Sequence, residues 1–380
     1  MRITARELNR ATLARQLLLD RSSLSVTDAM RHVVALQAQQ PASPYVALWN
    51  RLGGFDPAEL DAAFGDHRVV RAQLMRITMH AVHAEDHQGF REAMEPTLRA
   101  SRLGDPRFKA SGLTLAEADV LTGGLLDFAG QPRTNAECEA WLAGRLGAPM
   151  PPLAWRMLRQ YAPLWHVPAG APWSFGTRAY VAACPRPVLA DAGVSNLALQ
   201  TLIRRYLAGF GPASVADIGR FALVQRVRVK AAVQALGGEL AQLEGTDGTV
   251  LYDAPGARLP AGDTPAPPRL MAMWDSILLA YADRGRVIPP DYQKLVTRMN
   301  GDVLPTVMVD GYVAGVWRAV RDGIEATTFR PLPGSVWEGL AAEAQALVPF
   351  LADREPEVYR RYHHWWEKLP DGQTRLLPGP

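Results

Sequence analysis

The fold of this chain is decided by residues 69–82, VVRAQLMRITMHAV, a segment in which apolar and polar positions alternate. Alternation predicts β-strand, because successive side chains of a strand point to opposite faces of the sheet. Three helical patterns precede this segment, and they begin at Thr4, at Ser25 and after Pro57. Three helices followed by a pair of strands are the order of a winged-helix module, which we predict at the start of the chain.

The same order of elements occurs twice more. In the second occurrence, helical patterns within residues 114–162 precede strands on both sides of a turn at 168–172 that is rich in Pro and Gly. In the third, helical patterns within residues 199–236 precede strands at 240–244 and 249–252. These repeats predict three tandem modules.

A different kind of domain is predicted after Asp253, where Pro and Gly accumulate and mark a boundary. Strand patterns then flank Asp310-Gly311, a dipeptide typical of a tight hairpin turn, and a helical pattern follows over residues 336–352. The chain is therefore predicted to be an α+β protein, with winged-helix modules at residues 1–110, 111–190 and 191–254 and a β-rich domain at residues 255–380.

Composition limits the class of protein. With 380 residues, of which 48% are hydrophobic, the chain is long enough to form several domains with real cores. No uncharged apolar run reaches the roughly 18 residues of a transmembrane helix, and the first residues lack the apolar region of a signal peptide. We predict a soluble, cytoplasmic protein without a membrane partner.

The balance of charge leaves two interpretations open. The net charge is only +3, yet all except four of the 41 basic residues are arginine. The planar guanidinium group suits phosphates and base edges, which favours a nucleic-acid partner. A genome rich in G and C would produce the same bias, since Ala, Gly and Pro are also abundant. The basic cluster of Arg226, Arg228 and Lys230 likewise indicates either contact with phosphates or a solvated surface.

Nothing in the sequence indicates a metal or a cofactor. Cys138 and Cys184 are too few for a four-thiolate zinc site or an iron–sulfur cluster. His80, His83 and His87 have the spacing of a metal site on one helix face, but the alternating pattern places His80 in a strand. A phosphate loop, a dinucleotide fingerprint and a catalytic serine elbow are all absent from the sequence.

Two glutamines in the segment 36–41, LQAQQP, are the candidate functional residues. Ser25 and Asp28 predict a capped helix start, and Gln37 is the next position on the apolar stripe of that helix. A buried amide without hydrogen-bond partners costs about 1–3 kcal/mol, so Gln37 must find partners or face a cleft. Gln39 can share this site only if the helix ends near Ala38. The alternative is a helix end with solvated glutamines.

Two acids near the apolar run at 277–279 leave a similar choice. Asp275 or Asp283 would be structural if it paired with an arginine in the core, and catalytic if it faced a cleft.

Several motifs in the same order resemble one family over residues 3–365, the bacterial winged-helix family of alkylpurine DNA glycosylases. These motifs are the Gln-Ala-Gln element at 37–39, the strand Arg76-Ile77-Thr78-Met79-His80, the turn Gly211-Pro212-Ala213, Trp274-Asp275 with Asp283-Arg284 and Arg286, and Asp310-Gly311 with Gly315-Val316-Trp317-Arg318. The sequence departs from the family at Ala280-Tyr281, where many members have Gly-His, so any role of that histidine is in doubt here.

The resemblance implies a fold and a function. It implies three tandem winged helices and a β-barrel-like C-terminal domain around a DNA channel, in a monomer associated with the nucleoid when on DNA. It implies a monofunctional DNA glycosylase that removes N7-alkylguanine adducts from double-stranded DNA and unhooks interstrand crosslinks. Self-resistance to a DNA-alkylating natural product such as azinomycin B would be its biological role.

The resemblance also assigns residues. Gln37 and Gln39 fall on the family's Gln-apolar-Gln motif and are the expected catalytic residues. The expected contacts with DNA are His80, Arg178, Arg226, Arg228 and Lys230. The alternative is a non-enzymatic winged-helix regulator, which would have no need to hold paired amides at a helix end.

Elementary chemistry agrees with amides at such a site. A guanine alkylated at N7 is already cationic and leaves as a neutral base, so its departure needs no general acid. The charge that develops on the sugar then accepts a weak nucleophile, as in other oxocarbenium-like reactions. Two amides can orient a water molecule for this attack. No lysine lies near the motif, so we expect hydrolysis without a Schiff base.

Overall fold

The hairpin at residues 69–83 lies at the centre of a sheet that two of the predicted modules share. The computed structural model describes residues 1–151, 153–170, 172–176, 179–186 and 188–378. Strands β2 (Val69–Leu74) and β3 (Thr78–His83) pair in antiparallel fashion, and β2 also pairs with β5 (Leu164–Val167). The strand order is β1-β3-β2-β5-β6-β4. One six-stranded sheet therefore crosses the predicted boundary near residue 110.

The three helices predicted in the first unit begin where the sequence places them, but a further helix, α3 (Ala42–Arg51), was not predicted. Thr4 and Glu7 form a capping box, Ser25 caps the second helix, and Asp56 accepts a hydrogen bond from the backbone of Ala58. The remaining elements of this unit are α1 (Ala5–Arg15), α2 (Val26–His32), β1 (Leu36–Gln37), α3 (Ala42–Arg51), α4 (Pro57–Gly65), α5 (Ala84–Leu103) and α6 (Pro106–Lys109).

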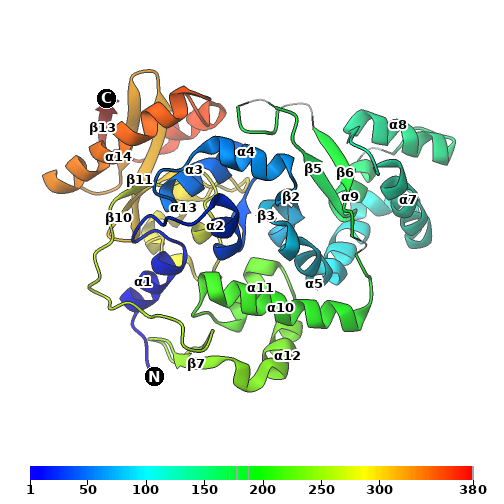
Figure 1. The fold of residues 1–380 in the computed structure, drawn as a ribbon, viewed down its shortest axis with the longest axis horizontal. Coiled ribbons are helices and arrows are strands. Elements are labelled where there is room, and N and C mark those ends of the chain that lie inside the picture. Colours follow the sequence, from blue (N-terminus) through cyan, green and yellow to red (C-terminus); the bar gives the residue numbers. More distant parts are fainter. Residues whose placement is uncertain (152, 171, 177–178, 187, 379–380) are drawn as a thin grey trace.

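The second and third units also have the predicted order of helices and strands. Thr114, Thr134 and Ser214 each form a capping box at a helix start. The elements are α7 (Leu115–Phe128), β4 (Arg133–Thr134), α8 (Asn135–Leu146), α9 (Ala154–Tyr161), β6 (Tyr180–Ala183), α10 (Ala192–Phe210), α11 (Val215–Ala222), α12 (Arg226–Leu236), β7 (Ala241–Glu244) and β8 (Val250–Asp253). In Figure 1, α7 and α8 lie at the end of the molecule opposite the C-terminal sheet, and the N-terminus lies beside β7.

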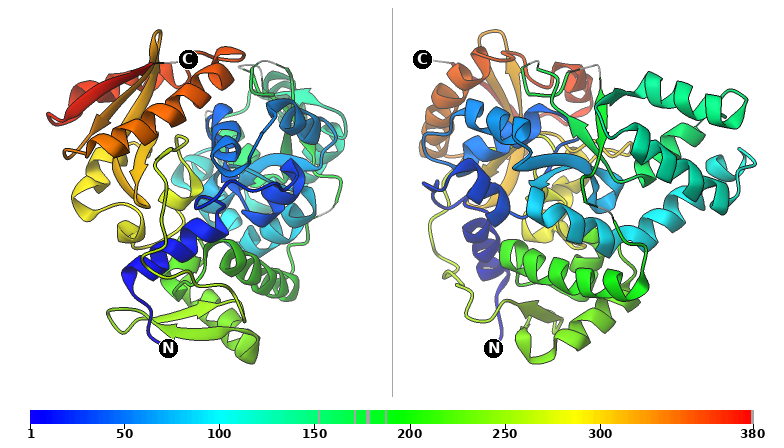
Figure 2. Two further views of the ribbon diagram at one scale, coloured as in Figure 1. Left: turned by 60° about the vertical axis from the view of Figure 1, so that its left-hand side comes forward. Right: turned by 45° about the vertical axis from the view of Figure 1, so that its right-hand side comes forward.

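The C-terminal part contains an open sheet and no closed barrel among the described residues, so the prediction of a barrel-like domain is wrong. The strand order is β13-β12-β11-β10-β9, and the two edge strands, β13 and β9, do not pair with each other. The elements are β9 (Arg269–Leu270), α13 (Gln293–Val296), β10 (Thr306–Val309), β11 (Tyr312–Val320), β12 (Gly323–Thr328), α14 (Gly334–Ala352) and β13 (Gln373–Pro378). Figure 2 shows α14 running along this sheet. The five strands are two to nine residues long. They do not close into a barrel, because β9 pairs only with β10.

The predicted hairpin at Asp310-Gly311 is confirmed. Both residues have positive φ, 49° and 80°, which is the backbone geometry of the tight hairpin turn that connects β10 and β11.

Helix α1 joins the third unit to the C-terminal part. The guanidinium of Arg15 forms an ion pair with Asp253, at 2.6 Å, in which both side chains are buried. Arg6 pairs with Asp310 at 2.9 Å, and Asn9 donates a hydrogen bond to the carbonyl of Gly311. Within the part of the chain that the structure describes, no helix is both long and apolar enough to cross a membrane.

Candidate active site

Gln37 lies on a short strand and not on the helix that the sequence predicts. Helix α2 ends at His32, and Val34 adopts a positive φ of 73°. The chain then extends along the edge of the hairpin, where Gln37 pairs with His80 and the backbone amide of Ala38 donates to the carbonyl of Met79. The helix prediction is wrong because the chain leaves helical geometry at Val34 and residues 36–37 pair with β3 instead.

The extended backbone solves the problem that a helix would pose for two glutamines. Residues two apart on extended chain point to the same side, whereas on a helix they do not. Gln37 and Gln39 accordingly line the same cleft. Gln37 is buried and Gln39 is exposed, so the two amides lie at different depths.

Arg76 holds the amide of Gln37. Its Nη2 atom donates to Oε1 of Gln37 at 2.6 Å and approaches Nε2 of His80 at 3.2 Å. Arg76 itself lies in the turn between β2 and β3 with a φ of 54°, which directs its side chain back under β1. The carbonyl of Gln37 is therefore engaged, and the NH2 group is the end of this amide that remains for the cleft.

His80 completes this arrangement as a neutral imidazole. Its Nδ1 lies 3.0 Å from the carbonyl of Thr78, which requires a proton on Nδ1 and leaves Nε2 to accept from Arg76. Burial, and then the charge of Arg76, lower the pKa of His80 to about 3. The side chain is fully buried, which argues against the predicted contact between His80 and DNA.

Gln39 has a weaker tie to the protein. Its Oε1 accepts a hydrogen bond from the backbone of Met79 at 3.4 Å. Between the two glutamines, the carbonyl of Ala38 accepts from Nε of Arg71 at 3.0 Å. Burial lowers the pKa of Arg71 to about 10, and its guanidinium lies 4.7 Å from the ring centre of Phe175. Arg71 and Arg76 thus fix the backbone and one side chain of the Gln-Ala-Gln element.

The two glutamines open onto a cleft of about 660 Å³ between the first unit, the second unit and the C-terminal part. The cleft is rich in arginine, and its aromatic residues come from the C-terminal part. Its lining includes Arg71, Arg156, Arg159, Arg361, Gln160, His166, Trp274, Asn300, Asp302 and Tyr362. Asp302 is the one carboxylate among the described lining residues.

The comparisons with known proteins agree with each other. The sequence profile described as DNA glycosylase AlkZ-like matches residues 30–350. The chain belongs to the AlkZ-like DNA glycosylase family. A curated relative, the interstrand DNA cross-link repair glycosylase of Streptomyces sahachiroi, is 25% identical in an alignment 359 positions long, and the match covers 87% of this chain and 91% of the relative.

A solved structure shares the fold of this AlkZ-like glycosylase. Streptomyces sahachiroi DNA glycosylase AlkZ superposes with a TM-score of 0.78, at 22% identity, over 90% of this chain and 95% of that one. The chain is therefore a DNA glycosylase and a homologue of a crosslink repair enzyme. The alternative of a non-enzymatic regulator is set aside.

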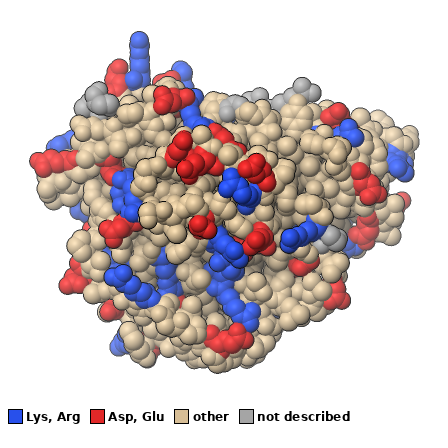
Figure 3. Space-filling model, viewed as in Figure 1, with Lys and Arg blue, Asp and Glu red and all other residues tan. Residues whose placement is uncertain are grey.

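The glycosylase places the predicted basic cluster on two sides of α12. Arg226 and Lys230 are exposed, whereas Nη2 of Arg228 donates to the hydroxyl of Ser195 at 2.9 Å and ties α12 to α10. Arg178 lies outside the described residues. On the face drawn in Figure 3, acidic and basic side chains are interspersed.

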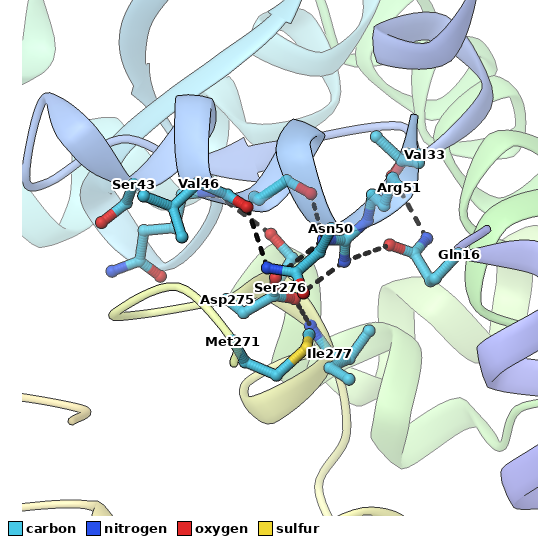
Figure 4. Close-up of polar contacts among 12 residues, drawn as sticks. Gln16, Val33, Ser43, Val46, Asn50, Arg51, Met271, Asp275, Ser276 and Ile277 are labelled. Atoms are coloured by element: carbon cyan, nitrogen blue, oxygen red, sulfur yellow. Dashed lines mark hydrogen bonds and ion pairs between the residues drawn. The ribbon is translucent and has the colours of Figure 1, made fainter. Parts of the chain in front are cut away.

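Asp275 and Asp283 both have structural roles. The two oxygens of Asp275 pair with the guanidinium of Arg51 at 2.8 Å each, and neither side chain has any exposed area. Figure 4 shows this pair between α3 and the 275–277 segment, with Gln16 on its other side. Asp283 is exposed and accepts a hydrogen bond from the backbone of Gly285 at 2.8 Å.

Tyr281 stands where many family members have histidine, and it is part of the core of this glycosylase. Its hydroxyl donates to the carbonyl of Phe210 and lies 2.8 Å from the hydroxyl of Thr12. The residue therefore connects α10 with α1 and does not face the cleft.

Sequence reasoning missed Arg71, Arg76 and Asp302 as parts of the site. An arginine within an otherwise apolar strand was a usable signal for Arg71, because a buried guanidinium needs specific partners. Asp302 gave no local signal, since it reaches the cleft through tertiary contacts. No group of His, Cys, Asp and Glu among the described residues could hold a metal ion.

Proposed function

We propose that this glycosylase hydrolyses the N-glycosidic bond of cationic N7-alkylguanine in double-stranded DNA and unhooks interstrand crosslinks built from such adducts. Protection against a DNA-alkylating natural product such as azinomycin B would be its role. The observation that carries the proposal is the Gln37 amide, oriented by Arg76 at the wall of a large, arginine-rich cleft. The units around this cleft would act as tandem winged helices that surround a DNA channel in a monomer.

The leaving group explains why amides suffice. Alkylation at N7 places a positive charge on guanine, and cleavage of the bond to C1′ returns both bonding electrons to the base, which leaves neutral. No acid has to protonate it. Positive charge then develops on the sugar, and water attacks C1′. The proton of that water leaves to solvent through the open cleft, so neither glutamine has to act as a strong base.

The two amides have different parts in this proposal. Oε1 of Gln37 accepts a hydrogen bond from Arg76. The NH2 group of Gln37 therefore donates to the oxygen of the attacking water. Gln39 is exposed, and its carbonyl, bound only by a long contact to Met79, accepts from the water. Orientation of this kind lowers the barrier by removing freedom of motion before the reaction. The arginines of the cleft bind the flanking phosphates.

The first test compares excision by the wild type and by Gln37→Ala, Gln39→Ala and the double variant. A duplex with one 7-methylguanine is incubated under single-turnover conditions, and alkali reveals abasic sites. We expect each single variant to lose about tenfold in rate or more, and the double variant to reach background. Gln40→Ala is the matched control, because Gln40 is the next residue but does not line this cleft.

Wild-type excision by the double variant would contradict the assignment of these residues. The substrate class is tested separately. Release of uracil or hypoxanthine at a rate near that of 7-methylguanine would show that a charged leaving group is not required, and borohydride trapping of a covalent adduct would show a Schiff base.

A further inference from the structure

A second pocket lies in the third unit, against the 282–293 segment. It has a volume of about 610 Å³ and is formed by α11, the start of α12 and the 282–293 segment. Its described lining residues are Ala216, Gly219, Arg220, Leu223, Val224, Gln225, Arg226, Ala282, Arg284 and Gln293. Three of them are arginines and none is an acid. We call it the arginine pocket, after Arg220, Arg226 and Arg284.

The three arginines have no carboxylate partner among the described residues. Arg220 and Arg226 are exposed and form no hydrogen bond or ion pair there. Arg284 donates to the hydroxyl of Thr297 at 2.8 Å, which is a neutral partner. Burial, and then the charge of Arg220, lower the pKa of Arg284. Like charges gathered in one hollow repel each other, and the repulsion is relieved when an anion binds between them.

Arg76 connects the amide site with helix α11, which forms part of this pocket. On one side it donates to Gln37, and on the other its Nη1 lies 3.5 Å from the carbonyl of Phe221 in α11. Burial, followed by the charges of Arg284 and Arg220, lowers its pKa. Arg76 therefore links the amide site to an element that lines the arginine pocket, although its own side chain lines neither the pocket nor the cleft.

The backbone adds donors to the pocket. Helix α12 has 11 residues and begins at Arg226, and the side chain of Gln225 does not cap it. The first amide groups of a helix have no partner within the helix, and they favour an anion.

We propose that the arginine pocket binds a phosphodiester group of the DNA backbone next to the damaged nucleotide and so seats that strand against the cleft. The inference rests on the proposed function, since it takes DNA as the ligand and the Gln37 cleft as the place of reaction. A phosphodiester fits because it is small, singly charged and rich in acceptors, which matches forked guanidinium groups and free backbone amides.

The test measures binding and not excision. Fluorescence anisotropy gives the affinity of the full chain for an undamaged duplex at several salt concentrations, for the wild type and for Arg220→Gln plus Arg226→Gln. Loss of one phosphate contact reduces the slope of log K against log salt by about 1, and we expect about tenfold weaker binding at low salt. The control, Lys109→Gln plus Arg258→Gln, removes the same charge from exposed sites that do not line the pocket.

Single-turnover excision of 7-methylguanine by the control pair, at saturating protein, should stay within about twofold of wild type, because neither of its residues lines the cleft or the pocket. A slope equal to that of the control pair would overturn the inference while leaving the proposed function intact. Titration with inorganic phosphate alone distinguishes the sources of the ligand. Binding of free phosphate that the variant loses, together with an unchanged duplex slope, would identify a small-anion site and also overturn the inference.

Discussion

At the scale of single residues, the site depends on one guanidinium group that serves two acceptors. Arg76 donates to both Gln37 and His80, and the neutral state of His80 is what keeps an acceptor available on Nε2. The two glutamines could be predicted from the sequence, because amides at positions of an apolar pattern demand an explanation. Arg76, which orients Gln37, could not be predicted, since contacts between a turn and a neighbouring strand leave no periodic signal.

Arg76 is therefore expected to be a positioning residue. In Arg76→Met the amide of Gln37 loses a charged hydrogen bond worth about 1.5–3 kcal/mol, which corresponds to about 10- to 100-fold in single-turnover excision. DNA affinity should change by less than about threefold, since the side chain is turned inward. Arg76→Lys should recover part of the rate, because an ammonium group can still donate to Gln37.

Rates and affinities together decide this prediction. If the methionine and lysine variants lose the same activity and also unfold at the same lower temperature, Arg76 has only a structural role.

At the scale of elements, local signals predict where helices begin, and pairing decides where strands lie. Capping residues such as Thr4 and Ser25 start helices at the predicted positions, because they act on the next three residues of the chain. The end of α2 was not predictable in this way, since β1 forms only against β3. Likewise, residues 373–378 form the edge strand β13 through their pairing with β12.

Strand β13 provides a matched pair of variants. Leu377 is buried opposite Ile324, whereas its neighbour Leu376 is 52% exposed. Leu377→Asp should lower the free energy of unfolding by about 2 kcal/mol or more, because it places a charge in the sheet core. Leu376→Asp should change it by less than about 0.5 kcal/mol. Urea unfolding measures both, and equal losses would mean that β13 does not pack as described.

At the scale of the whole molecule, the three units and the C-terminal part are not independent domains. The six-stranded sheet passes from the first unit into the second, and α1 is held by ion pairs to the third unit and the C-terminal part. The cleft exists only because these parts meet. Several histidines are enclosed in the same shared core, and their burial makes the stability of the whole protein depend on pH.

The expected direction follows from His80 and His87, whose pKa values burial lowers to about 3. In the unfolded chain they ionise near their usual pKa of about 6.5. Below that pH the unfolded state binds protons that the folded state does not bind. The contribution of these histidines to stability is therefore fully present above about pH 6.5 and decreases as the pH falls towards 3. Each histidine should cost about 1 kcal/mol between about pH 7.5 and 5.5.

Urea unfolding of His87→Gln at the two pH values checks this expectation. Glutamine can still accept from the indole of Trp165, so the variant should fold and lose less stability on acidification than the wild type does. His364→Gln, at an exposed position, should lose as much stability on acidification as the wild type does. If His87→Gln also loses as much stability on acidification as the wild type, burial does not keep His87 neutral.

The sequence by itself determined most helix starts and their caps, the Asp310-Gly311 turn and the candidacy of Gln37 and Gln39, because these depend on interactions within a few residues. Tertiary structure alone decided the rest. It made the strand of Gln37, joined two units through β2 and β5, left the C-terminal sheet open, and brought Asp302 to the cleft. Such features require segments that are far apart in the chain to meet, and the free energy of their pairing is not encoded in any one of them.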